Sequence, residues 1–291
     1  AKTGLDFAGP FETKFGRGRA HKKVYILVLT CMQTRAVHLE VTDSVDLTAV
    51  MNALSRFVDI RGMPTDILSD NFSTFISHDK ELQDWVRNLD LDQTISQISA
   101  DVTWHFTPPY APHHGGIYES MVKATKRALK TLTDKTLLDL DEFRTFVSRS
   151  AALLNGRPLA RVVEQASVKI LTPNHFLMGN LGGAITTEKL TPIKRWKTIS
   201  KLQDEFWDLF QKNYIHELKR LRRWKIVNTE IRLDQIVLES TPNLGTGCWR
   251  LAKVIELIPS SDGMVRKVKI RNSSGEFERA ITSLSPLELD C

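Results

Sequence analysis

Gly62-Met63-Pro64-Thr65-Asp66-Ile67-Leu68-Ser69-Asp70-Asn71 is the stretch that decides the fold we expect for this chain. A glycine and a proline break the chain, and an apolar run then ends in an acid and an amide. This pattern predicts a buried strand that carries the Asp70 carboxylate to its C-terminal edge. Open α/β sheets place their sites at that edge, so Asp70 and Asn71 are candidate site residues.

Two other acids stand in matching settings. Asp6 lies in the middle of a short predicted strand, Gly4-Leu5-Asp6-Phe7-Ala8-Gly9-Pro10. Glu119 follows His113-His114-Gly115-Gly116 and lies in the first turn of a strongly helical segment. Two strand acids and one helix acid can converge on divalent metal ions, which bind carboxylate oxygens and phosphate. We therefore expect a metal site built from these three carboxylates.

Length and cysteine content limit the class of protein. A chain of 291 residues favours two domains over one. Its apolar runs are too short to span a bilayer, and its start does not resemble a secretory signal. Because the first residue is Ala1 and not Met, we expect the chain to be part of a longer protein. The three cysteines lack paired spacing, which fits a reducing compartment and neither a disulfide framework nor a zinc knuckle.

The positive charge is concentrated in one block. The net charge of the chain is +6, yet the block Lys189–Lys225 alone holds 11 Lys and Arg against 4 Asp and Glu. Such a block suits a phosphate backbone. A solvated helix face explains it equally well.

The first 160 residues predict a meander of three strands, a helix, and then the strand of Asp70. Apolar residues at helical spacing follow Asp43 or Ser44, either of which can cap that helix. A further strand, Val102–Phe106, leads into a Pro-rich segment that cannot form regular structure. The meander strands are Leu5–Ala8, Val24–Thr30 and Ala36–Val41.

The segment Ile117–Thr131 is the clearest predicted helix. Its apolar face docks on the sheet, and almost opposite lies a charged row with steps of four, three and four residues. That row consists of Glu119, Lys123, Lys126 and Lys130. An ordinary i, i+4 pair of Glu119 and Lys123 explains part of the pattern but not the Pro-rich lead-in. The three lysines are candidate contacts to DNA phosphates.

The second half of the chain predicts helices and then short strands. Asp141 is the expected cap of a helix through Asn155, and Arg161–Leu190 reads as irregular, with Leu171–His175 as an extended connector. A long helix, Trp196–Trp224, follows. Its last turns carry the candidate DNA contacts Arg220, Arg222 and Arg223.

From Leu233 the pattern predicts a small five-stranded SH3-like barrel. Four of its expected strands are Ile236–Glu239, Trp249–Ile258, Val265–Arg271 and Phe277–Leu284. One side of the third strand is wholly basic, and its Lys267, Lys269 and Arg271 are further candidate DNA contacts.

In combination, several motifs resemble the integrase region of BEL/Pao-type LTR retrotransposons, and the resemblance covers essentially the whole chain. It rests on Gly4–Pro10, Thr34–Glu40, Ser69–Asn71, Trp104–Phe106, Pro109–Gly116, Leu154–Leu159, Leu171–Leu177 and the strands from Trp249 to Glu276.

The resemblance implies an α/β ribonuclease H-like catalytic core at residues 1–160, with a mixed five-stranded sheet and helices. An extended and helical linker at 161–230 and a small all-β domain at 231–291 complete the chain. It also implies that Asp6, Asp70 and Glu119 hold two Mg²⁺ or Mn²⁺ ions. Water then trims the 3′ end of the element's DNA, and the freed 3′-hydroxyl attacks target DNA.

Further implications concern partners and location. Two DNA ends must be joined in concert, so a homo-multimer on double-stranded DNA is expected, without a membrane. Integration takes place in the nucleus, after a cytoplasmic particle stage, and a host chromatin factor is a possible partner. His114 is a candidate DNA contact. Zinc spacing is absent around His105, His113 and His114, so we interpret these histidines as strand-end and loop residues rather than metal ligands.

The chain departs from the family's pattern at two points. Phe72 stands where the family has a glycine after Asp-Asn, and the zinc domain that normally precedes the core is missing from this sequence. If the turn there needs a positive φ, Phe72 is strained. Two alternatives to an active integrase therefore stay open: a domesticated DNA-binding protein with weak or no catalysis, and a different ribonuclease H-like nuclease.

Overall fold

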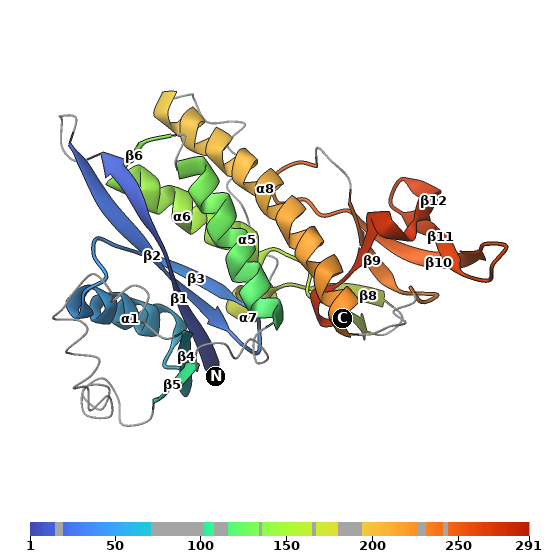
Figure 1. Cartoon of the computed structure of the whole chain (residues 1–291), viewed down its shortest axis with the longest axis horizontal. Coiled ribbons are helices and arrows are strands. Elements are labelled where there is room, and N and C mark those ends of the chain that lie inside the picture. The colour runs from blue at the N-terminus through green and yellow to red at the C-terminus, as the bar shows by residue number, and fades with distance from the viewer. Residues whose placement is uncertain are drawn as a thin grey trace. The chain divides into compact units, whose positions relative to one another are not determined.

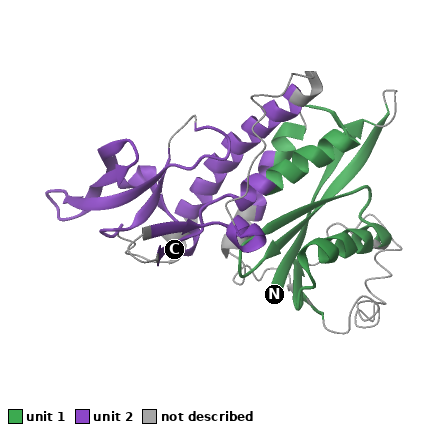
Figure 2. Cartoon of the chain, turned by 180° about the vertical axis from the view of Figure 1, so that it is seen from behind, with its two compact units in different colours: residues 1–118, 129–151 green, residues 119–128, 152–291 purple. Residues whose placement is uncertain are grey.

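A computed structural model describes most of the chain (Figure 1). The described residues are 1–14, 20–70, 102–107, 116–133, 136–164, 167–179, 194–225, 231–240 and 244–290. Contacts divide the chain into two units, Ala1–Tyr118 with Leu129–Ala151, and Glu119–Ala128 with Ala152–Cys291 (Figure 2). The predicted Pro-rich segment, Asn71 and His114 lie outside the described residues, and the division into three domains stays a prediction.

The first unit is built on a mixed sheet with the strand order β3-β2-β1-β4-β5. Strands β1 to β3 are antiparallel neighbours, whereas β1, β4 and β5 are parallel. The short β6 pairs with the far end of β1. The predicted mixed sheet is thus confirmed. The strands are β1 (Lys2–Lys14), β2 (His21–Cys31), β3 (Val37–Thr42), β4 (Asp66–Asp70), β5 (Thr103–Thr107) and β6 (Leu138–Asp139).

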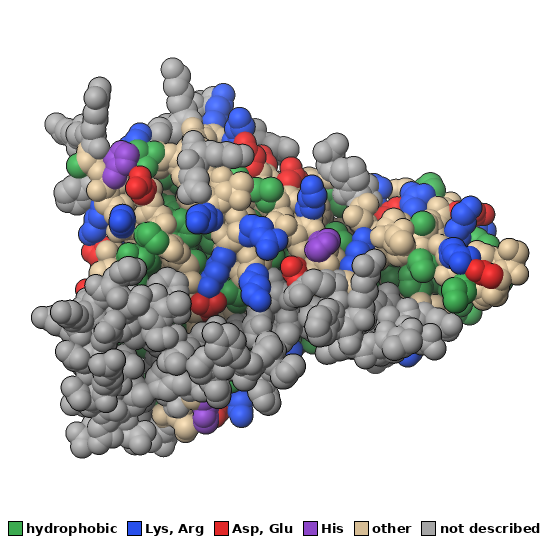
Figure 3. Space-filling model, in the orientation of Figure 1, with side chains coloured by type: hydrophobic (Ala, Val, Ile, Leu, Met, Phe, Trp, Pro, Cys, Tyr) green, Lys and Arg blue, Asp and Glu red, His purple; other side chains and the backbone are tan. Residues whose placement is uncertain are grey.

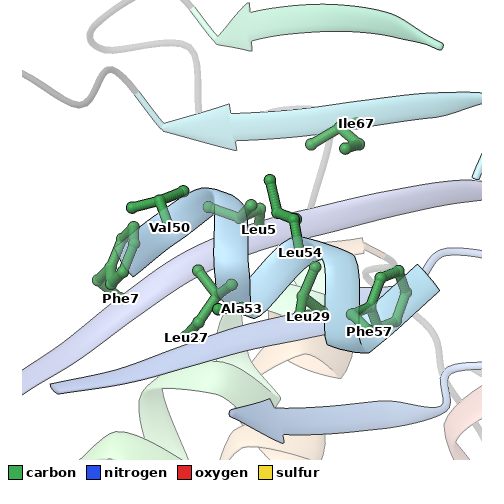
Figure 4. Close-up of a cluster of buried hydrophobic side chains, with 9 residues drawn as sticks. All are labelled: Leu5, Phe7, Leu27, Leu29, Val50, Ala53, Leu54, Phe57 and Ile67. Carbon is green, nitrogen blue, oxygen red and sulfur yellow. The ribbon is translucent and has the colours of Figure 1, made fainter. Parts of the chain in front are cut away.

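Helix α1 (Leu47–Arg61) covers one face of this sheet. The buried stripe of α1 packs against alternate residues of β1, β2 and β4 (Figure 4). Each side chain in this cluster is at most 7% exposed, so the cluster excludes water. Alternation then turns the intervening residues of these strands to the other face. The cluster consists of Leu5, Phe7, Leu27, Leu29, Val50, Ala53, Leu54, Phe57 and Ile67.

The expected cap of α1 was wrong. Asp46 caps the helix, and its carboxylate accepts a hydrogen bond of 2.8 Å from the backbone nitrogen of Ala49. Asp43 instead forms an ion pair of 2.9 Å with Lys22 on β2. Ser44 donates its hydroxyl to Asp46 and so supports the cap from outside the helix. Capping depends on which side-chain oxygen reaches the free amides of the first turn, and Asp46 is closer in sequence to that turn than Asp43 or Ser44.

Helix α6 (Leu140–Asn155) packs on the opposite face of the sheet, where the Phe143 ring lies 5.6 Å from that of Phe11. Its cap also differs from the expected Asp141. Asp139 accepts from the backbone nitrogen of Glu142 at 2.9 Å, and the Glu142 carboxylate accepts from the Asp139 nitrogen at 3.0 Å. This reciprocal capping box fixes the start of the helix.

A bulge at Gly9 interrupts the pairing of β1 with β2, between Ala8 and Phe11. Gly9 has φ of +131°, and a Cβ there would lie 3.0 Å from the Tyr25 ring and 3.2 Å from the Val24 carbonyl oxygen. We expect Gly9→Ala to lower the free energy of unfolding by about 1–3 kcal/mol, because the substitution adds backbone strain and a clash. Urea unfolding followed by circular dichroism measures the loss.

The matched control is Gly245→Ala, because a Cβ at Gly245 meets only the Cys248 sulfur at 3.6 Å. Equal stability of the two variants would contradict the strain at Gly9.

The expected irregular structure was wrong for residues 161–164 and 167–178, whereas residues 180–190 lie outside the described part of the chain. Strands β7 (Ala160–Glu164) and β8 (Ser167–Leu171) form an antiparallel hairpin, and α7 (Pro173–Met178) follows directly. A capping box of Thr172 with His175 and a proline in the first turn start α7. These signals are present in the sequence, since Thr172-Pro173 begins a helix as readily as it extends a loop.

The predicted long helix is confirmed as α8 (Lys194–Lys225), followed by an antiparallel sheet of order β12-β11-β10-β9-β13. The predicted last strand is two strands, because the 3₁₀ turn η3 (Ile281–Ser283) divides it. Within the described residues β12 and β13 are the two edges of this sheet, so the SH3-like barrel stays a prediction. The strands are β9 (Ile236–Glu239), β10 (Leu251–Pro259), β11 (Val265–Asn272), β12 (Gly275–Ala280) and β13 (Leu284–Pro286).

Helix α8 packs on the segment that leads into β10. The Trp249 ring lies 4.9 Å from the fully buried Trp207, in edge contact, and 5.8 Å from Tyr214. Gln211 donates to the Cys248 carbonyl oxygen at 3.2 Å. The aromatic faces thus join α8 to the sheet that follows it. In the part of the chain that the structure describes, no helix is long and apolar enough to cross a membrane.

A buried ion pair holds the second unit together. The Arg157 Nε donates to Glu288 at 3.0 Å, the Tyr214 hydroxyl donates to the same carboxylate at 2.6 Å, and all three side chains are almost fully buried. Burial and the charge of Glu288 both raise the pKa of Tyr214 well above its usual value. Arg157 also donates to the Leu154 carbonyl oxygen at 2.8 Å, so the end of α6 and the 3₁₀ turn η4 (Glu288–Asp290) meet at α8.

Candidate metal and nucleic-acid site

Two of the three predicted catalytic acids occupy neighbouring positions in the first sheet. The parallel register of β1 and β4 pairs Lys2 with Asp66 and ends at the pair Leu5 and Ser69. Asp6 and Asp70 are the residues that directly follow this last pair on the two strands. Neighbouring strands lie about 4.8 Å apart, so the backbones of the two acids are close. Asp70 also pairs with Thr107, so β4 and β5 both end at this row.

Asp6 lies on the face of β1 opposite α1, because it alternates with Leu5 and Phe7 in the α1 cluster. It is half-buried, and one of its oxygens accepts a hydrogen bond of 2.7 Å from the Phe7 nitrogen. Across β2 its partner in the register is Val28, which is 1% exposed. Asp6 is thus a carboxylate on a rigid central strand, with one oxygen oriented by the backbone.

The third acid, Glu119, is the fourth residue of α5 (Gly116–Thr133) and belongs to the second unit. The side chains of Asp70 and Glu119 lie outside the described part of the chain, so their convergence with Asp6 stays a prediction. Among the side chains that are described, no group of three or more His, Cys, Asp or Glu gathers around a possible metal position.

The candidate lysines of α5 face away from its buried side. Lys123 and Lys130 are exposed and Lys126 is half-buried, whereas Ala124 and Ala128 are at most 1% exposed. Figure 3 shows Lys and Arg side chains gathered where Figure 1 places α5. Arg127 is also exposed. Arg127 was not among the predicted DNA contacts, although its spacing of four residues from Lys123 and three from Lys130 places it on the same face of the helix.

The basic side of β11 is partly neutralised by the neighbouring strand. Glu276 on β12 lies 2.9 Å from the Lys269 nitrogen and 2.6 Å from an Arg271 nitrogen. Its hydrogen bond and charge raise the pKa of Lys269 above its usual value. Of the three predicted contacts on β11, only Lys267 makes no ion pair within the described residues. In the sequence, the acid Glu276 in the facing strand of the hairpin was the feature that could have predicted this neutralisation.

The candidates on α8 are placed by the backbone alone. Arg220, Arg222 and Arg223 lie in the last turns of this helix, where a positive charge interacts favourably with the helix dipole. Their side chains are not among those that the structure describes.

His105 on β5 has a carboxylate partner that the sequence did not reveal. Its Nε2 lies 3.0 Å from an Asp66 oxygen, and the Lys2 nitrogen lies 4.0 Å from the same oxygen. Hydrogen bonds from the Thr65 hydroxyl and then from His105 lower the pKa of Asp66. Asp66 is therefore an ionised acceptor at neutral pH.

Comparisons with known proteins add three findings. Residues 194–287, from the first residue of α8 to the residue before Glu288, match the model of a family of unknown function, DUF5641. No curated protein matches the chain. A chain of the simian T-cell lymphotropic virus intasome, solved by cryoEM in complex with PP2A regulatory subunit B56 gamma, is similar at 12% identity. The match has a TM-score of 0.39 and covers 98% of this chain and 78% of that chain.

Proposed function

We propose that this protein is a metal-dependent DNA strand transferase, an integrase of the BEL/Pao type with a ribonuclease H-like core. The observation that carries the proposal is the register of β1 and β4, because Asp6 and Asp70 directly follow its last pair, Leu5 and Ser69. The order β3-β2-β1-β4-β5, with three antiparallel strands followed by parallel ones, supports the same core. The motifs around these acids supply the link to integration.

The donor set fits magnesium or manganese. Carboxylate oxygens are the ligands that these hard ions prefer, and a rigid strand that carries Asp6 limits the reorganisation on binding. Asp6, Asp70 and Glu119 would hold two ions, which supply an activated attacking oxygen and a stabilised leaving oxygen. The backbone nitrogen of Phe7 orients Asp6, and the lysines of α5 would bind and align the DNA backbone.

The proposal extends to partners and place of action. The substrates are the 3′ ends of retroelement DNA and a target duplex, and the working form is a multimer in the nucleus. The C-terminal sheet would act as an SH3-like module in that assembly.

A strand-transfer assay tests the function. The protein is incubated with a labelled duplex that carries a terminal-repeat end, together with target DNA and Mg²⁺ or Mn²⁺. We expect 3′ trimming and then joined product, and none after chelation of the metal. Binding without turnover would instead identify a domesticated DNA-binding module, and cleavage without joining a different nuclease.

The α5 lysines give a second prediction. We expect Lys123→Ala combined with Lys130→Ala to raise the Kd for duplex DNA about tenfold, almost independently of sequence. The slope of log Kd against log salt should fall by about 0.9 for each phosphate that the protein no longer neutralises. Fluorescence anisotropy at several salt concentrations measures both quantities.

The control for this pair is Lys201→Ala with Lys212→Ala, which removes two exposed lysines from α8. If both double variants change the affinity and the slope equally, α5 holds no special position on DNA.

A further inference from the structure

We propose that Lys2, Asp66 and His105 form a contact site for the DNA phosphate backbone, beside the row of the catalytic acids. This proposal rests on the proposed function, since it assumes that DNA lies on this face of the sheet. In it, Lys2 and His105 are positioning residues that bind the strand and do not take part in the reaction.

The three residues come from three neighbouring strands of one rigid sheet. Lys2 on β1 pairs in register with Asp66 on β4, and His105 on β5 pairs with Leu68, two residues further along β4. Strand alternation puts Lys2 on the same face of β1 as Asp6, opposite α1. The side chains of Lys2 and His105 are 63% and 50% exposed, so both are accessible from solvent.

The chemistry of the cluster suits an anion held by two donors. The Asp66 carboxylate only accepts, so Nε2 of His105 carries the proton of their 3.0 Å hydrogen bond. The other ring nitrogen, Nδ1, takes no part in this bond. The Lys2 ammonium lies 4.0 Å from Asp66, at the limit of an ion pair, and keeps donors for a phosphate oxygen.

Stability alone is a weak reason for this arrangement. Exposed cross-strand charge pairs contribute only about 0.2–1 kcal/mol, and Lys2 and His105 are both at least half exposed. One carboxylate that holds two donors in place restricts their freedom before a ligand arrives, which lowers the entropy cost of binding.

Distances along the strands fit a positioning role. Lys2 precedes Asp6 by four residues, or about 13 Å, and His105 precedes Thr107, the partner of Asp70, by two residues, or about 7 Å. These separations are too long for contact with reacting atoms at the acids. They allow contact with neighbouring phosphates of the same strand, which strengthens DNA binding equally before and during the reaction.

The same sheet offers a matched control. His21 and Lys22 on β2 also pair with carboxylates, His21 with Glu12 at 3.2 Å and Lys22 with Asp43 at 2.9 Å. Their side chains are 47% and 37% exposed. Each double variant, Lys2→Ala with His105→Ala or His21→Ala with Lys22→Ala, removes one lysine and one histidine.

The experiment measures binding of a fluorescein-labelled duplex at several salt concentrations and strand transfer at saturating DNA. For the Lys2 and His105 variant we expect an increase in Kd of about tenfold and a salt slope smaller by about 1 to 2. The strand-transfer rate at saturating DNA should stay within about twofold, as expected for a loss of uniform binding. The control variant should keep its Kd within about twofold.

Equal changes in the two double variants would overturn the inference while leaving the proposed function intact. A wild-type chain that neither binds DNA nor joins it would overturn the proposed function instead. Circular dichroism of both double variants before the assay identifies any loss of folding. The single variant Lys2→Arg keeps the positive charge, so it should keep most of the wild-type affinity for DNA if the contact is electrostatic.

Discussion

Asp70→Asn should lower the rate of metal-dependent strand transfer by about 10³-fold or more. The substitution removes a charged metal ligand at the row where β4 and β5 end, and bound metal ions contribute several kcal/mol to such reactions. The shape of the side chain is kept, so the affinity for DNA measured in Ca²⁺ should change little. Asp6→Asn should cause a similar loss, because Asp6 is the neighbour of Asp70 in the sheet.

The double variant of Asp6 and Asp70 gives the sharper test. When two residues act as one catalytic unit, the loss of either one removes most of the rate enhancement. The strand-transfer rate of the double variant should therefore be no lower than that of either single variant. Asp59→Asn removes an exposed carboxylate from α1, the helix on the other face, and should keep full activity. Strand transfer that survives in Asp70→Asn would exclude the metal site proposed here.

Arg157→Met should destabilise the second unit by about 3–5 kcal/mol. It leaves the Glu288 carboxylate buried without its ion-pair partner, and an uncompensated buried charge is costly. Stabilities of domains are only about 5–15 kcal/mol, so the loss is a large part of the total. Urea unfolding followed by the fluorescence of the buried Trp207 measures it.

Two variants separate the buried charge from the loss of a side chain. Arg157→Met combined with Glu288→Leu removes both charges and should regain much of the stability. Arg271→Met breaks an exposed pair with Glu276 and should cost less than about 1 kcal/mol. An Arg157→Met variant as stable as Arg271→Met would show that the buried pair contributes little.

The sheet was predictable because its signals are local. Apolar runs and period-two alternation marked the strands around Leu27 and Leu39, and helical spacing marked α1 and α8. The parallel pairing of β1 and β4 ends at Leu5 and Ser69, the residues just before Asp6 and Asp70. Asp6 and Asp70 were singled out because Asp6 interrupts a short apolar strand and Asp70 ends another.

The missed features depend on partners that are distant in sequence or in the facing strand. Glu276 neutralises the basic side of β11 only because the hairpin of β11 and β12 folds back on itself. Asp66 on β4 contacts His105 on the neighbouring strand β5, although the two residues are 39 positions apart in the sequence. The sequence shows Arg157 only as part of the motif Leu154–Leu159, yet the side chain is fully buried and pairs with Glu288, which also accepts from Tyr214. No local pattern reports such a contact.

The separation of Arg157 from Glu288 has a consequence for biosynthesis. The two residues lie 131 positions apart, so a ribosome adding about 5–20 residues per second needs roughly 7–26 s to supply the carboxylate after the guanidinium has been made. Throughout that interval the arginine must remain hydrated, and the end of α6 cannot reach its final environment. We therefore expect the second unit to mature late on the ribosome and to be the part of a nascent chain that chaperones hold longest.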